Sequence, residues 1–172
     1  MLIDTVTNIF MQSIQTSQLT IFSKVLALIF DPITLIAISL IIAIYLYVKS
    51  SKKKGIIFTS AILLTGILIK VSKEIFQRTR PLNQIVQEIG FSFPSGHSTM
   101  AVVFFGLIVY LFSKNKSKKI KLISSLIAIL TIFLVGFTRI YLRVHWLTDI
   151  IGGFIFGGII LFLTILSFKK QT

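Results

Sequence analysis

Five long apolar stretches are the feature that most limits how this chain can fold. They cover residues 32–48, 55–72, 98–113, 122–138 and 150–168. A helix that crosses a bilayer needs about 20 mostly apolar residues, with about 17 as the lower bound. Of the 172 residues, 55% are hydrophobic and only 13% are charged, which excludes a disordered chain. The sequence therefore predicts an all-α integral membrane helical bundle with about five transmembrane helices, in a single domain over residues 1–172.

Residues 1–30 differ from the rest of the chain. Apolar residues recur there at helical spacing among Thr, Gln, Ser and Asn, which predicts amphipathic N-terminal helices at the membrane interface. Asp31 and Pro32 then interrupt the pattern and open the first span, so residues 31–170 form the predicted transmembrane core. A further crossing through residues 19–30 would be short, and the sequence leaves open whether residues 1–30 cross the membrane.

The formal net charge of +13 is sorted between the two ends of the predicted spans. Eleven lysines share one side: Lys49, Lys52, Lys53, Lys54, Lys114, Lys116, Lys118, Lys119, Lys121, Lys169 and Lys170. The positive-inside rule makes this side cytoplasmic, together with the C-terminus. All four arginines and all five acidic residues fall on the other, extracytoplasmic side. We interpret the lysines as topology determinants that contact anionic lipids of the bilayer, and expect no nucleic-acid partner.

The first of three polar clusters on the outer side is KEIFQRTRP, residues 73–81. Lys73 and Arg80 are seven residues apart, so on a helix that ends at Pro81 they would share one face. Two cations on one face would bind a doubly charged oxyanion. The alternative is a basic cluster that touches lipid head groups. The pattern assigns no role to Arg78.

The second cluster is PSGH, residues 94–97, just before the third span. Ser95 stands where an N-cap belongs, and Gly96 would let a ligand approach the backbone. The free N–H groups at the start of the helix would then bind phosphate, with His97 in the first turn beside it. The alternative is a simple turn and cap with an interfacial histidine.

The third cluster contains Arg139, His145 and Asp149. The i, i+4 spacing of the last two places a carboxylate within reach of an imidazole. A carboxylate on Nδ1 fixes the tautomer and raises the basicity of Nε2, which suits a nucleophile or a base. The alternative is a local His–Asp cap. Tyr141 and Arg143 are expected to shape the entrance to this site.

The three clusters together favour phosphoryl transfer without a metal ion or another cofactor. The chain has no cysteine and two histidines, and its only predicted carboxylate–histidine pair is His145 with Asp149, so a metal site is disfavoured. Cations would neutralise the transferring oxygens, one histidine would attack, and the other would protonate the leaving group.

In this order, the segments at 73–81, 94–97 and 139–149 resemble the three signatures of the type 2 phosphatidic acid phosphatase (PAP2) family. These are membrane lipid phosphatases related to vanadium haloperoxidases and bacterial acid phosphatases. The resemblance implies that His145 is the nucleophile that forms a phosphohistidine, that Asp149 orients it, and that His97 is the general acid. It also implies a set of phosphate-binding residues: Lys73, Arg80, Ser95, Gly96 and Arg139.

The resulting expectation is a membrane phosphatase whose substrate is a lipid phosphate or pyrophosphate at the outer interface. Undecaprenyl pyrophosphate and phosphatidylglycerol phosphate are favoured, and phosphatidic acid is a further candidate. A catalytically silent protein of the same fold that binds or transports phospholipids is the alternative, although both histidines are present. The sequence does not indicate an oligomeric state. Glycine pairs at 152–153 and 157–158 predict close packing of the last span, with dimerisation as the alternative.

Overall fold

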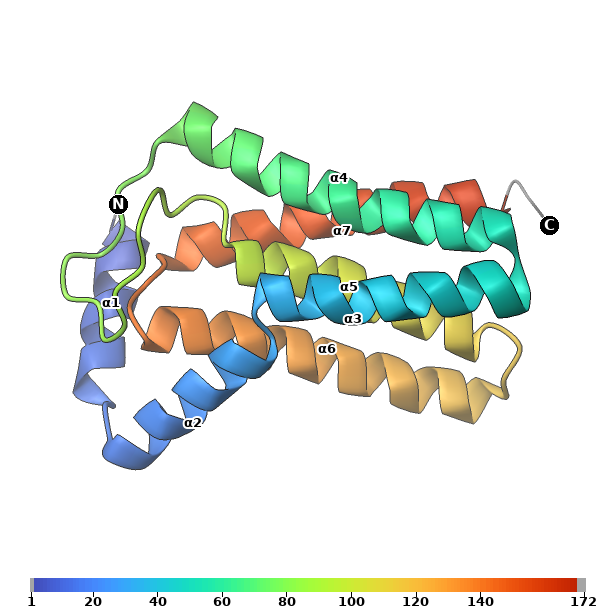
Figure 1. Cartoon of the computed structure of the whole chain (residues 1–172). Coiled ribbons are helices and arrows are strands. Elements are labelled where there is room, and N and C mark those ends of the chain that lie inside the picture. The colour runs from blue at the N-terminus through green and yellow to red at the C-terminus, as the bar shows by residue number, and fades with distance from the viewer. Residues whose placement is uncertain (1, 170–172) are drawn as a thin grey trace.

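A computed structural model describes residues 2–169 of the chain. These residues form helices and connecting loops, with no strand among them (Figure 1). In chain order, the elements are α1 (Leu2–Ser13), α2 (Ser17–Ile29), α3 (Pro32–Tyr45), a π-helical turn η1 (Leu46–Ser50), α4 (Lys52–Phe76), α5 (Gly96–Ser113), α6 (Lys118–Tyr141) and α7 (Leu147–Lys169).

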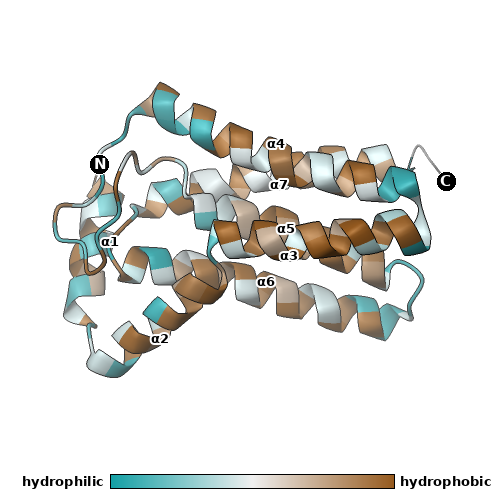
Figure 2. Ribbon diagram, in the orientation of Figure 1, coloured by the Kyte–Doolittle hydropathy of each residue, from teal (hydrophilic) through white to brown (hydrophobic). Residues whose placement is uncertain are grey.

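The five predicted spans are confirmed as helices long and apolar enough to cross a membrane. They are α3 with η1, α4, α5, α6 and α7, and they run alongside one another in the bundle. Figure 2 shows hydrophobic residues along much of these helices, and many of their large apolar side chains are exposed. Because lipid tails surround such a bundle, exposed apolar side chains are the expected surface of a spanning domain.

The predicted N-terminal helices are also present. The helices α1 and α2 lie across one end of the bundle rather than along it (Figure 1). At 13 residues, α2 is about 20 Å long, which is shorter than the apolar core of a bilayer. Tyr141 at the end of α6 fixes these helices in place, because its hydroxyl bonds to the backbone of Thr16 and to the hydroxyl of Thr20.

Local chemistry explains where the spans begin. The carboxylate of Asp31 accepts a hydrogen bond from the N–H of Ile33 at 2.8 Å, and Pro32 occupies the first helical position of α3. Ser117 caps α6 in the same way, through a bond from the N–H of Ile120. Each of these spans therefore starts at a residue whose side chain satisfies a free N–H group.

The centre of the bundle is α5, which contacts α3, α4, α6 and α7. The sequence predicts close packing of the last span, and the glycines of α7 permit a close contact with α5. A Cβ atom on Gly153 would lie 3.0 Å from the Ser95 carbonyl oxygen, and one on Gly157 would lie 2.8 Å from the Thr99 carbonyl oxygen. Small residues at these positions let the two backbones pack against each other.

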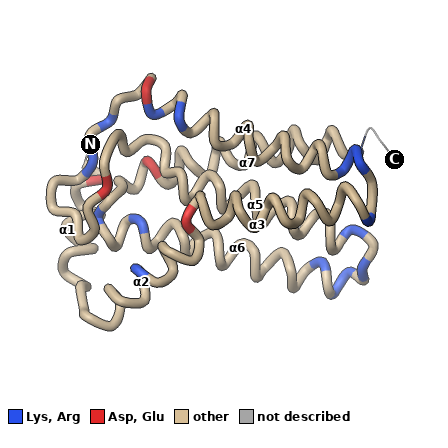
Figure 3. Tube along the Cα trace, in the orientation of Figure 1, with Lys and Arg blue, Asp and Glu red and all other residues tan. Residues whose placement is uncertain are grey.

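The charges are sorted between the two ends of the bundle as the sequence predicts. In Figure 3 the acidic residues lie at the end that α1 and α2 cover, and groups of basic residues lie in the connections at the opposite end. Nine of the eleven lysines on this side lie in the η1–α4 and α5–α6 connections or in the helix ends that adjoin them. Lys170 lies outside the described residues.

One prediction about α4 is wrong. Lys73 and Arg80 do not share a helix face, because α4 ends at Phe76 and Gln77 adopts a left-handed conformation with φ 45°. The N–H of Gln77 closes the helix by bonding to the Lys73 carbonyl. Arg80 therefore belongs to the loop of residues 77–95, which crosses the end of the bundle and leads into α5.

Candidate active site

His145 and Asp149 lie where α7 begins. Nδ1 of His145 is 3.4 Å from Oδ2 of Asp149, and the N–H of Trp146 donates to the same oxygen at 2.9 Å. Both side chains are buried. The predicted i, i+4 pair is therefore formed. A carboxylate that accepts the proton of Nδ1 leaves the lone pair of the imidazole on Nε2.

The Nε2 atom of His145 faces positive charge. NH1 of Arg80 lies 3.3 Å from it. Burial lowers the pKa of His145 to about 3. The hydrogen bond to Asp149 opposes this shift, and the charges of Arg80 and Arg139 add to it. The imidazole is therefore neutral near pH 7, which is the state that a nucleophile needs.

A carboxylate that the sequence did not single out occupies the space next to Nε2. Oε2 of Glu88 lies 3.0 Å from NH1 of Arg80 and 4.0 Å from Nε2 of His145, while Oε1 pairs with NH2 of Arg139. The side chains of Arg80 and Arg139 are 9% and 3% exposed. Two buried guanidinium groups thus hold one anion beside the histidine, an arrangement that also suits phosphate oxygens.

Arg80 reaches this position from the loop, where backbone carbonyls fix its side chain. NH1 donates to the Val144 carbonyl at 2.7 Å, and Nε donates to the Gly90 carbonyl at 3.1 Å. Gly90 has φ +80°, a conformation that favours glycine. Although Arg80 lies in a loop and not on α4, its side chain still lies beside His145 and shares Glu88 with Arg139.

Lys73 lies near the two arginines that pair with Glu88. Its ammonium group donates a hydrogen bond to the Phe91 carbonyl. The ammonium group is also close enough to Arg80 and Arg139 for electrostatic repulsion between the three positive charges. Within residues 2–169 no hydrogen bond or ion pair joins Lys73 to Glu88. The structure therefore brings Lys73 to the same end of the bundle as the two arginines, while its direct role toward an anion stays a prediction.

Ser95 caps α5 as predicted. Its Oγ accepts hydrogen bonds from the N–H and the hydroxyl of Ser98, at 3.4 and 3.1 Å. The N–H of Ser95 donates to the Asp149 carbonyl at 3.1 Å, so the N-terminal end of α5 lies beside α7. A Cβ atom on Gly96 would make only ordinary contacts, the nearest at 3.5 Å. Ligand approach to the Gly96 backbone therefore stays a prediction.

The second histidine, His97, has a carboxylate partner of its own. Nε2 of His97 lies 3.5 Å from Oδ2 of Asp31, the residue that caps α3. His97 is 8% exposed, and the charges of Arg80 and Lys73 act on it. No hydrogen bond joins the two histidines in the part of the chain that the structure describes. The sequence located His97 and indicated that Asp31 ends one helical pattern, but not that they pair.

Arg78, to which the sequence pattern assigned no role, is central to the site. Its side chain forms ion pairs with Asp149 and with Asp4 of α1. The sequence contained one indication of this pairing: Asp4 lies in an amphipathic segment, and an acidic residue that becomes buried needs a partner.

The expectation that Tyr141 and Arg143 shape the entrance to the site is wrong, because both side chains are buried, at 0% and 6% exposed.

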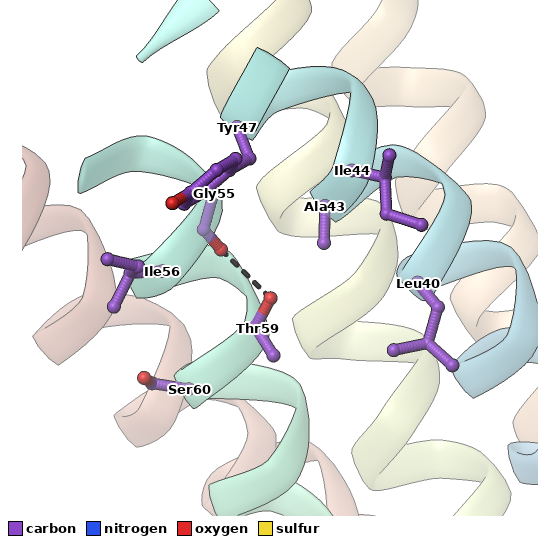
Figure 4. A pocket seen from close by; sticks show the side chains of 8 residues that line it. All are labelled: Leu40, Ala43, Ile44, Tyr47, Gly55, Ile56, Thr59 and Ser60. Atoms are coloured by element: carbon purple, nitrogen blue, oxygen red, sulfur yellow. Dashed lines mark hydrogen bonds between the residues drawn. The ribbon is translucent and has the colours of Figure 1, made fainter. Parts of the chain in front are cut away.

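Two further features of the described structure bear on its chemistry. Residues 2–169 contain no group of three or more His, Cys, Asp or Glu side chains placed to hold a metal ion. A pocket of about 340 Å³ between α3 and α4, at the end away from the histidines, is lined mainly by apolar side chains (Figure 4). The hydroxyl of Thr59 in this pocket donates to the Gly55 carbonyl, and no cationic side chain lines it.

Comparison with known proteins identifies relatives of the chain. Residues 54–172 match the sequence profile of the PAP2 superfamily. The chain is 42% identical over 104 residues to phosphatidylglycerophosphatase B of Bacillus subtilis. The matched region covers 56% of this chain and 49% of that protein. It is 29% identical over 130 residues to undecaprenyl-diphosphatase of Sulfolobus acidocaldarius, which covers 72% of this chain and 59% of that protein. The chain thus spans about half the length of the curated relatives that it matches.

Solved structures share the fold. A crystal structure of the transmembrane PAP2 type phosphatidylglycerolphosphate phosphatase from Bacillus subtilis matches with a TM-score of 0.90 and 30% identity. The match covers 98% of this chain and 86% of that one. LpxE of Aquifex aeolicus matches with a TM-score of 0.72 and 24% identity, over 94% of both chains, which supports the fold alone.

Proposed function

Because this chain belongs to the PAP2 superfamily, we propose that it is a membrane phosphatase that removes phosphate from a lipid phosphate or pyrophosphate. One observation carries the proposal. Nε2 of His145, with Asp149 on the other ring nitrogen, faces two buried arginines that already hold an anionic group. A neutral nucleophile beside a site for anionic oxygens is what phosphoryl transfer to a histidine requires.

The reaction has two steps. Nε2 of His145 attacks phosphorus and forms a P–N bond, while the bond between phosphorus and the leaving oxygen breaks. His97 gives its proton to that oxygen, and the product alcohol or lipid monophosphate departs. In the second step His97 takes a proton from water, whose oxygen attacks phosphorus. The P–N bond then breaks, which releases inorganic phosphate and restores both histidines.

The cationic groups stabilise charge on the transferring phosphoryl oxygens. Arg80 and Arg139 bind them in place of Glu88, and Lys73 adds charge from the side. The start of α5 supplies further donors in the backbone N–H of Gly96 and the hydroxyl of Ser95, since the N–H of Ser95 bonds to the Asp149 carbonyl. Asp149 keeps the proton of His145 on Nδ1 and stabilises the imidazole as it is phosphorylated.

The position of the site suggests an amphiphilic substrate. The groups lie at the ends of spanning helices, so a lipid phosphate can bind there while its tails stay in the bilayer. The names of the relatives favour phosphatidylglycerol phosphate and undecaprenyl pyrophosphate over phosphatidic acid. The lysines at the opposite end of the bundle support an extracytoplasmic site and a cytoplasmic C-terminus.

A phosphate-release assay on the purified protein in detergent tests this proposal. The panel contains phosphatidylglycerol phosphate, undecaprenyl pyrophosphate and phosphatidic acid, each with excess EDTA. We expect release from at least one of them, no release by His145→Ala, and an acid-labile phosphoenzyme in rapidly quenched wild type. Strict dependence on a divalent metal would contradict the mechanism, and an active His145→Ala variant would remove the assigned nucleophile.

A further inference from the structure

The two oxygens of the buried Asp149 carboxylate have different partners. Oδ2 accepts from the N–H of Trp146 and lies 3.4 Å from Nδ1 of His145. Oδ1 accepts from NH1 of Arg78 at 2.5 Å. Since Asp149 is 0% exposed, water does not compete for either oxygen. The guanidinium group on Oδ1 and the Trp146 N–H on Oδ2 therefore hold the carboxylate with Oδ2 toward the histidine.

Arg78 is itself held on several sides. Besides Asp149, NH1 donates to the Thr148 hydroxyl at 2.6 Å, and NH2 donates to Oδ2 of Asp4 at 2.7 Å. The guanidinium carbon lies 5.7 Å from the centre of the Trp146 ring, which adds a cation–π contact. A guanidinium group presents several N–H donors in a rigid plane, so one arginine can bridge two carboxylates.

Asp4 completes this network from α1. It is 3% exposed, and its Oδ1 accepts from the N–H and the hydroxyl of Thr148, both at 3.0 Å. Burial raises the pKa of Asp4, but the hydrogen bonds from Thr148 and Arg78 outweigh burial, so the pKa lies below its ordinary value. The carboxylate is thus ionised at neutral pH. A buried charge of this kind is tolerated because it is paired and hydrogen-bonded.

From this chain of contacts, we infer that Asp4 and Arg78 are positioning residues for His145 and act through Asp149. The order is Asp4, Arg78, Asp149 and His145, and it makes the N-terminal helix α1 part of the catalytic apparatus. A simple anchor for α1 would need only the bond between Asp4 and Thr148. The bond from Arg78 to Oδ1 of Asp149 connects that anchor to the nucleophile.

This inference rests on the proposed function, since Asp149 needs accurate placement only if His145 attacks phosphorus. Loss of Arg78 would leave Oδ1 of Asp149 buried without its donor. The carboxylate would then turn or shift, and the imidazole would lose its alignment. Arg80 and Arg139, which pair with Glu88, form no hydrogen bond or ion pair with Asp4 or Arg78 in the described structure. Phosphate binding should therefore survive the change.

The test compares Arg78→Gln, Arg78→Lys and Asp4→Asn with wild type in detergent. We expect Arg78→Gln to lower kcat about 100-fold, because displacement of a reacting group by about 1 Å from its aligned position slows a reaction by about that factor. Asp4→Asn should lower kcat about 10-fold, since the asparagine side chain keeps the shape of aspartate but lacks its negative charge. The kcat of Arg78→Lys should lie between those of the other two variants. KM and the inhibition constant for inorganic phosphate should change less than threefold in all three. Gln12→Ala, on an exposed position of α1, is the matched control.

A double variant adds a readout that a purely structural role would not give. If the two residues act in series, Arg78→Gln with Asp4→Asn should have the kcat of Arg78→Gln alone, whereas independent effects would multiply. Unchanged kcat in both single variants, or an equal loss of phosphate affinity and kcat, overturns the inference while the activity of wild type upholds the proposed function. A wild type without turnover on any lipid phosphate overturns both.

Discussion

Oε2 of Glu88 lies 3.0 Å from NH1 of Arg80, so the protein places an anionic group of its own in the site assigned to the substrate phosphate. The same carboxylate pairs with Arg139 and faces His145. A phosphate that binds the two arginines must therefore displace Glu88. The loop that carries Glu88 also presents Leu82 and Ile89, which are 98% and 99% exposed, as apolar residues at the end of the bundle.

Replacement of this competitor should strengthen binding of phosphate. We expect Glu88→Gln to lower the inhibition constant of inorganic phosphate about 10-fold, equivalent to about 1.4 kcal/mol, because an amide competes poorly for two guanidinium groups. Inhibition kinetics on a lipid phosphate measure this, with Gln87→Ala, on the exposed neighbouring position, as the control. Weaker phosphate binding by Glu88→Gln would mean that Glu88 supports the site rather than competes for it.

The role of His97 as general acid can be tested through the leaving group. His97→Gln should lower kcat about 10²- to 10⁴-fold on a lipid phosphate, whose leaving oxygen needs a proton. The loss should be much smaller on a nitrophenyl phosphate, whose leaving group departs without one. Release of phosphate from the two substrates by the same variant provides the comparison. An equal loss on both would assign His97 to binding or structure instead.

Sequence reasoning predicted the spans and the motif residues because both depend on local pattern. Apolar runs of the right length located α3 to α7, and spacing placed Asp149 one helical turn after His145. The prediction that Lys73 and Arg80 share a helix face failed, because the position of Arg80 depends on a backbone turn. Nothing in KEIFQRTRP indicates that Gln77 becomes left-handed and moves Arg80 off the helix.

Partners distant in sequence could not be predicted for a different reason. Glu88 reaches Arg139 across 51 positions, and Asp4 reaches Thr148 across 144. An isolated acidic residue in a sequence indicates only that a charge needs a partner if it is buried, and several cations lie at the same end of the bundle. The choice among them is made by how the loop of residues 77–95 and α1 dock on α7.

The low pKa of His145 predicts how stability responds to acid. Burial lowers that pKa to about 3, whereas an unfolded histidine titrates near about 6.5. Between these values the unfolded chain binds a proton that the folded protein does not, so this group destabilises the fold as pH falls from about 6.5 toward 3. We expect the apparent Tm of wild type in detergent to fall more steeply over this range than that of His145→Gln. Parallel curves would contradict a neutral, buried imidazole.

Two adjacent glycines of α7 offer a matched test of packing. A Cβ atom on Gly157 would lie 2.8 Å from both the Thr99 carbonyl oxygen and Cβ of Val102, while one on Gly158 would meet nothing within 4 Å. Gly157→Ala should therefore cost about 1–3 kcal/mol and lower the apparent Tm by several degrees. Gly158→Ala should leave it unchanged or slightly higher. Equal Tm values would show that α5 and α7 separate without cost.

The proposed orientation can be tested with two asparagines at opposite ends of the bundle. Asn83 lies in the loop near the histidines and Asn115 in the α5–α6 connection; both are exposed, and the chain has no native cysteine. In intact cells, Asn83→Cys should react with a membrane-impermeant thiol reagent and Asn115→Cys should not. Both should react after the membrane is permeabilised. The reverse pattern would place the site on the cytoplasmic face.

The hydrogen bonds between Asp4 and Thr148 also have a consequence for the order of assembly. During synthesis Asp4 is made 144 positions before Thr148, its partner on α7. The carboxylate therefore lacks this partner until α7 has been made and inserted. Only then can α1 settle over the end of the bundle, so the alignment proposed for His145 can form only after α7 has been inserted.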